Sequence, residues 1–113
     1  MPGLSTRLHR AIIYLEDHGF SYVKKVEKWN QFSRRREDLW GADVACFSPT
    51  QGIALVQVTD DSRFRGDVDR LTADPVVKEW LGSGGRFLVL ALDKHGPRGK
   101  RKLWTVRQEE IRL

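Results

Sequence analysis

The sequence predicts an α/β domain in which a mixed central β-sheet is flanked by helices. Residues 5–19 place apolar side chains at helical spacing, and residues 42–59 contain two short apolar segments around a loop. Residues 86–93, "RFLVLALD", form a continuous apolar run, which is typical of a strand buried on both faces. The predicted order of elements is α-β-β-β-α-α-β-β. The length of 113 residues predicts one domain, 1–113.

The first half of the chain supplies one helix and the first strand. The helix spans "STRLHRAIIYLEDHG", with Ser5 able to cap its start and Gly19 able to end it. Residues 20–30, "FSYVKKVEKWN", mix aromatic and β-branched residues with lysines, which favours a half-exposed strand. Residues 31–38, "QFSRRRED", are predicted to form a basic loop.

The second half is predicted to contain helices over residues 60–85, in two pieces that break near Asp74 and Pro75. The break is expected because the residue before proline avoids the helical region. After the buried strand, residues 94–102, "KHGPRGKRK", are predicted to form a basic turn. Residues 103–111, "LWTVRQEEI", supply the last strand.

Composition excludes several classes of protein. No apolar run approaches the roughly 18 residues of a membrane span, and the N-terminus lacks the apolar core of a signal peptide. We therefore expect a cytoplasmic protein without membrane contact. Cys46 is the single cysteine, so an internal disulfide and a four-cysteine zinc site are both excluded. The net charge of +5 suits an anionic partner such as nucleic acid, although an inert basic surface is the alternative.

The segment "GADVACFSPTQGIALVQVTDD", residues 41–61, places polar side chains inside two apolar strands, about 42–47 and 53–59. Side chains alternate between the two faces of a strand. A loop at 48–52 then puts Asp43 opposite Gln57, with their Cβ atoms about 5 Å apart.

Thr59 lies one step further along the same predicted face as Gln57. An acid, an amide and a hydroxyl thus converge at one end of an apolar face. An unpaired carboxylate there would cost several kcal/mol unless it is hydrogen-bonded, hydrated or bound to a metal. The alternative interpretation is that Asp43 sits at the strand edge and accepts a hydrogen bond from Thr59 or from a backbone amide.

These segments resemble the PD-(D/E)xK, or restriction-endonuclease-like, nuclease superfamily. "GADVACF" is similar to the segment with the metal-binding Asp, and "LVQVT" to the acid-x-Lys segment. The resemblance assigns Asp43 to the metal-binding acid, Gln57 to the acid position and Thr59 to the lysine position. The chain also resembles small phage and prophage proteins related to Holliday junction resolvases and VRR-NUC nucleases. The resemblance implies that the chain has a restriction-endonuclease-like core. It also implies a phage-encoded protein that acts in the host cytoplasm.

The resemblance implies Mg²⁺- or Mn²⁺-dependent hydrolysis of phosphodiesters. Asp43, the Gln57 amide oxygen and the backbone C=O of Val58 would hold the cation, weakly because only one carboxylate is present. Thr59 departs from the family pattern because it carries no charge and is not a general base. Lys24, Lys25 and Arg36 are candidates to supply the missing positive charge.

Three further residues are auxiliary candidates. Asp38 could be a second ligand, or it could pair with Arg34 or Arg35 in the basic loop. Glu16 could act as an extra ligand, as in some resolvases, or face solvent. Trp40 could stack on unpaired bases, or belong to the core.

The predicted function is that of a DNA-binding, metal-dependent endonuclease that acts on branched or structured DNA, as resolvases do, and that works as a homodimer. The alternatives are a catalytically inactive nucleic-acid-binding module of the same fold and a phage-encoded protein-interaction factor. Basic residues expected to contact phosphates gather in clusters along the chain. They are Lys24, Lys25, Arg34, Arg35, Arg36, Arg63, Arg98, Lys100, Arg101 and Lys102.

Overall fold

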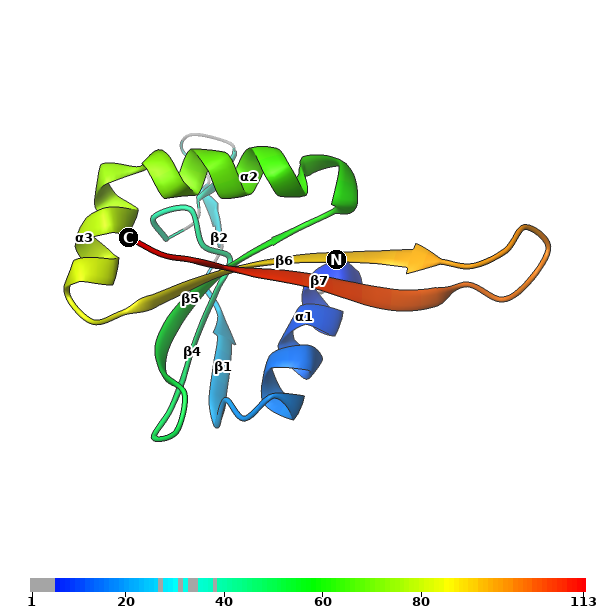
Figure 1. Ribbon diagram of the computed structural model, residues 1–113, viewed down its shortest axis with the longest axis horizontal. Coiled ribbons are helices and arrows are strands. Elements are labelled where there is room, and N and C mark those ends of the chain that lie inside the picture. The colour runs from blue at the N-terminus through cyan, green and yellow to red at the C-terminus, as the bar shows by residue number, and fades with distance from the viewer. Residues whose placement is uncertain (1–5, 27, 31, 33–34, 38) are drawn as a thin grey trace.

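The computed structural model describes residues 6–26, 28–30, 32, 35–37 and 39–113. It has three helices and seven strands in these parts of the chain (Figure 1). In chain order they are α1 (Thr6–Asp17), β1 (Tyr22–Lys25), β2 (Lys28–Asn30), β3 (Arg35–Glu37), β4 (Val44–Ser48), β5 (Gly52–Thr59), α2 (Asp61–Ala73), α3 (Pro75–Gly82), β6 (Arg86–His95) and β7 (Leu103–Ile111).

Five strands form one mixed sheet in the order β1-β4-β5-β6-β7. The β1–β4, β4–β5 and β6–β7 pairs are antiparallel, whereas β5 and β6 are parallel. The chain between β5 and β6 forms α2 and α3, as expected for a parallel connection. The prediction of an α/β fold with a mixed sheet flanked by helices is confirmed.

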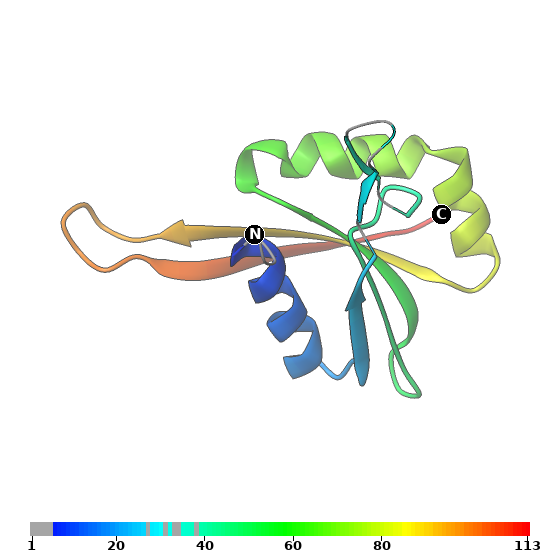
Figure 2. The ribbon, with the colours of Figure 1, turned by 180° about the vertical axis from the view of Figure 1, so that it is seen from behind.

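Helices cover both faces of the sheet (Figures 1 and 2). On one face, α1 buries Leu8, Ala11 and Leu15 against the sheet. On the other face, α2 buries Phe64, Val68 and Leu71. Residues 87–92 of β6 contribute alternately to the two cores and are all buried, which explains their continuous apolar run.

The predicted break between the two helices is present. Asp60 caps α2 by accepting a hydrogen bond from the Arg63 N–H, and Asp74 caps α3 by accepting one from the Val76 N–H. Pro75 occupies the first turn of α3, where its missing N–H is not needed.

The segment before β4 differs from its prediction. The expected single strand over residues 20–30 is divided into β1 and β2, and the expected loop over residues 31–38 contains β3. β2 and β3 pair with each other as a separate two-stranded sheet. The backbone N–H and C=O groups of β2 and β3 need hydrogen-bond partners, and they find them in each other. The prediction used the pattern of side chains alone and therefore missed this pairing.

The predicted register between β4 and β5 is confirmed where the two strands pair. Phe47 lies opposite Ile53, and the ladder runs on to Val44 opposite Val56. Ser48 and Gly52 also pair, so the connecting turn is shorter than the expected five-residue loop. No helix among the described residues is long and apolar enough to cross a membrane.

Candidate functional site

A tight turn delivers the chain to Asp43. Leu39 and Ala42 exchange two backbone hydrogen bonds, of 3.0 and 2.9 Å. Between them, Trp40 and Gly41 both have positive φ, 53° and 85°. Two successive positive φ angles are what a type I′ turn requires, and they are strained for a bulky residue such as Trp40. The turn is therefore a place where the fold maintains an unfavourable backbone conformation just before the candidate acid.

Asp43 directly precedes β4 and is hydrogen-bonded to β5 and to the residue that follows β1. Its N–H donates to the Val56 C=O at 2.8 Å, and its C=O accepts from the Val26 N–H at 2.9 Å. Its Oδ2 accepts from the Val58 N–H at 2.9 Å, and the residue is only 9% exposed. The β4–β5 ladder ends at Val44 and Val56, and beyond it the Asp43 carboxylate adds a side-chain hydrogen bond to β5. A hydrogen bond to a backbone amide was the alternative interpretation of this residue.

The side chain of Gln57 contacts Val58, the residue of β5 that also binds the Asp43 carboxylate. Its Nε2 donates to the Val58 C=O across a long 3.4 Å. Its Oε1 is buried, and the described part of the chain offers it no hydrogen-bond partner. Most buried polar atoms are satisfied, so this oxygen needs an explanation. The structure thus brings Asp43 and Gln57 together on the backbone of Val58.

Thr59 is the last residue of β5 and is 6% exposed. It is followed at once by the Asp60 cap of α2.

The oxygen donors of Asp43, Gln57 and Val58 suit a hard cation, since they comprise one carboxylate, one amide oxygen and one backbone carbonyl. No group of three or more His, Cys, Asp or Glu side chains with metal-binding geometry occurs among the described residues. The unsatisfied Gln57 Oε1 is the feature that fits a bound cation, and the single carboxylate fits weak binding.

A second polar cluster lies at the ends of β5 and β6, where the sequence predicted no site. The Asp93 carboxylate accepts from the Asp61 N–H at 2.6 Å and from Arg7 at 3.0 Å. His95 Nε2 lies 2.7 Å from Asp61 Oδ2, and Arg7 also donates to the Leu92 C=O. Because these contacts join α1, α2 and β6, the cluster acts as a structural cross-link. The available signal was a pair of acids at the ends of two parallel strands, Asp61 shortly after β5 and Asp93 near the end of β6.

The predicted basic residues are distributed over separate parts of the molecule. Lys24 and Lys25 are exposed on β1, and Arg63 lies 3.9 Å from the Asp60 carboxylate. Residues 98–102 belong to the loop between β6 and β7, which projects beyond the helices (Figure 1). Their side chains are exposed, and the four predicted cations there, Arg98, Lys100, Arg101 and Lys102, occupy one surface region.

The auxiliary candidates are placed only in part. Glu16 is exposed on α1. Trp40 is 54% exposed, with its ring 6.4 Å from that of Trp80, so the alternative that it belongs to the core is wrong. Arg34 and Asp38 lie outside the described residues. The structure gives the backbone of Arg35 and Arg36 in β3, and their side chains lie outside what it describes.

Comparison of the chain with models of known protein families, with curated proteins and with solved structures finds no match. The resemblance to PD-(D/E)xK nucleases therefore stays a prediction that depends on Asp43, Gln57 and Thr59. The geometry at Val58 is the observation from which a function can be argued.

Proposed function

We propose that the chain is a DNA-binding, metal-dependent endonuclease that acts on branched or structured DNA and has a restriction-endonuclease-like core. One observation carries the proposal. The Gln57 side-chain amide and the buried Asp43 carboxylate both contact Val58, and the buried amide oxygen, Gln57 Oε1, has no hydrogen-bond partner among the described residues. An unsatisfied buried oxygen costs free energy, and a cation would remove that cost.

Asp43, Gln57 Oε1 and the Val58 C=O would hold the cation, Mg²⁺ or Mn²⁺. When bound, the cation supplies Lewis-acid chemistry that polarises a phosphate and activates water. The Val58 N–H holds the Asp43 carboxylate in place through its 2.9 Å hydrogen bond. This bond occupies part of the carboxylate's acceptor capacity, which supports weak metal affinity.

Thr59 and the lysines of β1 are the other side chains to which we assign a role. Thr59 can donate a hydrogen bond to a phosphate oxygen, but its hydroxyl cannot replace the charge of a lysine. Lys25 pairs with Val44, the residue after Asp43, and is exposed. It is the best placed of the candidates on β1 to supply a positive charge, with Lys24 one residue away.

The decisive experiment is a cleavage assay on linear, flap and four-way-junction DNA with Mg²⁺ or Mn²⁺. We expect the wild type to cleave at least one branched substrate, and Asp43→Asn to lose cleavage while remaining folded. Asp69→Asn is the matched control, because Asp69 is an exposed acid on α2. Cleavage by Asp43→Asn at the wild-type rate, or no cleavage by the wild type, would contradict the proposal.

The second candidate is a DNA-binding module of the same fold without catalytic activity. It is favoured by the hydrogen bond that the Asp43 carboxylate accepts from the Val58 N–H, because this bond gives the carboxylate a structural role. DNA binding that is unchanged by EDTA and accompanied by no cleavage would support this candidate. Absence of salt-sensitive DNA binding would instead favour a protein-interaction factor. Sedimentation velocity tests the homodimer that we propose for either DNA-binding form.

A further inference from the structure

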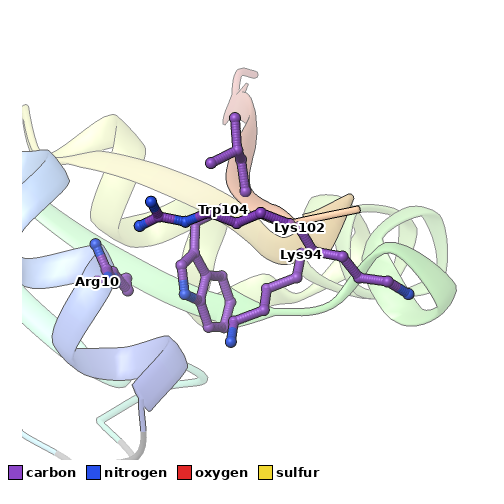
Figure 3. Close-up of a pocket in the computed structure, with 6 residues that line it drawn as sticks. Arg10, Lys94, Lys102 and Trp104 are labelled. Atoms are coloured by element: carbon purple, nitrogen blue, oxygen red, sulfur yellow. The ribbon is translucent and has the colours of Figure 1, made fainter. Parts of the chain in front are cut away.

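We propose that a pocket binds phosphate groups of a DNA strand at the base of the β6–β7 arm, which comprises residues 94–102 and projects beyond the helices (Figure 1). The inference rests on the DNA-binding part of the proposed function and not on hydrolysis. Figure 3 shows this pocket, called here the Trp104 pocket. Its volume is about 740 Å³. It is lined by Arg10, Lys94, Arg101, Lys102, Leu103 and Trp104.

Two cationic side chains, which come from different elements, lie over the Trp104 ring. Arg10 of α1 places its Cζ 5.9 Å from the ring centroid, and Lys94 of β6 places its Nζ 5.5 Å from it. Lys94 and Trp104 lie opposite each other in the β6–β7 ladder. Trp104 is partly buried against the core under α1, so the ring is a fixed platform for both cations.

In the part of the chain that the structure describes, no carboxylate lies within ion-pair distance of these cations. Among the described residues, Arg10, Lys94, Arg101 and Lys102 make no ion pair. Other arginines of the domain do, as Arg86 shows with Glu110 at 2.9 Å. Like charges held around one pocket repel each other, and a bound anion relieves this repulsion.

The arm also carries the excess charge of the whole chain. Residues 94–102 hold five of the 20 Lys and Arg residues and none of the 15 Asp and Glu residues, so the rest of the chain holds 15 of each. A partner with regularly repeated negative charge can contact the Trp104 pocket and the exposed cations of residues 94–102 at the same time. DNA carries one phosphate per nucleotide, and a pocket of this volume accommodates a nucleotide unit.

The backbone of the arm suits contact with a duplex or a junction. The Lys100 N–H donates to the Pro97 C=O at 3.1 Å, and Gly99 has a φ of 80°. A Cβ on Gly96 would lie 3.0 Å from the Arg101 C=O, so the two sides of the loop approach closely there. The arm is thus a narrow two-stranded ribbon, a shape that the major groove admits.

The test is fluorescence anisotropy of labelled duplex, flap and junction DNA in EDTA, titrated at several KCl concentrations. The pocket variant is Arg10→Ala/Lys94→Ala, in which both replaced residues are exposed. We expect at least tenfold weaker binding and a salt slope lower in magnitude by about one to two. The matched control is Arg70→Ala/Lys78→Ala, which removes the same two charge types from α2 and α3. Circular dichroism melting shows whether each variant remains folded.

The outcomes separate the pocket from the proposed catalytic function. Wild-type affinity and salt slope in the pocket variant would overturn the inference and leave the nuclease proposal intact. Weakened binding in the pocket variant alone, with no cleavage by the wild type, would support the pocket and contradict hydrolysis. Tighter binding of the wild type to phosphatidylserine vesicles or to polyglutamate than to DNA, at equal salt, would overturn the assignment to DNA. Failure of the wild type to bind DNA would overturn it together with the DNA-binding proposal.

Discussion

The contact between Arg86 and Glu110 provides a direct test of what holds the sheet together. Arg86 begins β6, and Glu110 lies near the end of β7. Two parallel hydrogen bonds of 2.9 Å join the guanidinium to the carboxylate. A further nitrogen of Arg86 donates to the Gln51 C=O at 3.0 Å and to its side chain at 3.1 Å. The perturbation is Arg86→Met, which keeps much of the side-chain length and removes all four hydrogen bonds.

We expect Arg86→Met to lower the free energy of unfolding by about 2 to 3 kcal/mol. The side chains of Arg86 and Glu110 are 30% and 18% exposed, so solvent screens the pair only in part. Hydrogen bonds to charged groups contribute about 1.5 to 3 kcal/mol, and loss of one partner leaves the other desolvated. Arg112, at 3.5 Å, remains as a weak partner for Glu110 and keeps the loss below that of a fully buried pair.

The assay is urea unfolding of the wild type, Arg86→Met, Glu110→Gln and the double variant. A double-mutant cycle isolates the coupling between the two side chains, which we expect to be about 1 to 2 kcal/mol. DNA affinity should stay unchanged in these variants, because Arg86 and the Trp104 pocket lie at opposite ends of the β6–β7 pairing. A loss below about 0.5 kcal/mol, or coupling near zero, would refute the reasoning.

The same pair predicts the effect of acid. The hydrogen bond from Arg86 lowers the pKa of Glu110 below its usual value. The stabilisation is present above the unfolded-state pKa, about 4.3, and is lost as the pH falls through the lower folded-state pKa. The difference in unfolding free energy between the wild type and Glu110→Gln should therefore shrink in that acidic range. A difference that is constant down to the lowest pH at which both proteins fold would contradict this assignment.

Three other sites give shorter tests. Gly85→Ala should lower the unfolding free energy by about 1 to 3 kcal/mol, because a Cβ there would lie 2.2 Å from the Trp80 ring; Gly82→Ala, in open space, is the control. Burial raises the pKa of Cys46 to about 12, so its thiol should react with Ellman's reagent only after unfolding, and rapid reaction of the native protein would count against this. Asp60→Ala should cost about 1 kcal/mol in urea unfolding by removing the α2 cap, whereas Asp60→Ser should restore most of it.

Local rules determined most of the secondary structure. The spacing of Leu8, Ala11 and Leu15 predicted α1, and the proline after Asp74 predicted the break between α2 and α3. Alternation along β4 and β5, together with a loop placed at residues 48–52, predicted their register correctly. Each of these signals depends on neighbouring residues, through side-chain periodicity or the steric limits of one peptide bond.

Local rules also narrowed the interpretation of Asp43 without deciding it. The sequence placed an acid, an amide and a hydroxyl near one strand end, and it left a metal and a backbone amide as alternative partners. The hydrogen bond to the Val58 N–H depends on how the chain bends beyond the ladder. That bend follows the turn at Trp40 and Gly41, whose positive φ angles no apolar pattern predicts.

Only the tertiary structure decided which side chains that are distant in the sequence lie close together in space. Arg10 and Trp104 are far apart in the sequence, and nothing in either segment predicts that they meet. They meet because α1 packs on the face of the sheet from which the Trp104 ring extends. Hydrophobic patterning specifies which face of each element is buried, but the relative position of two exposed edges depends on the packing of the whole core.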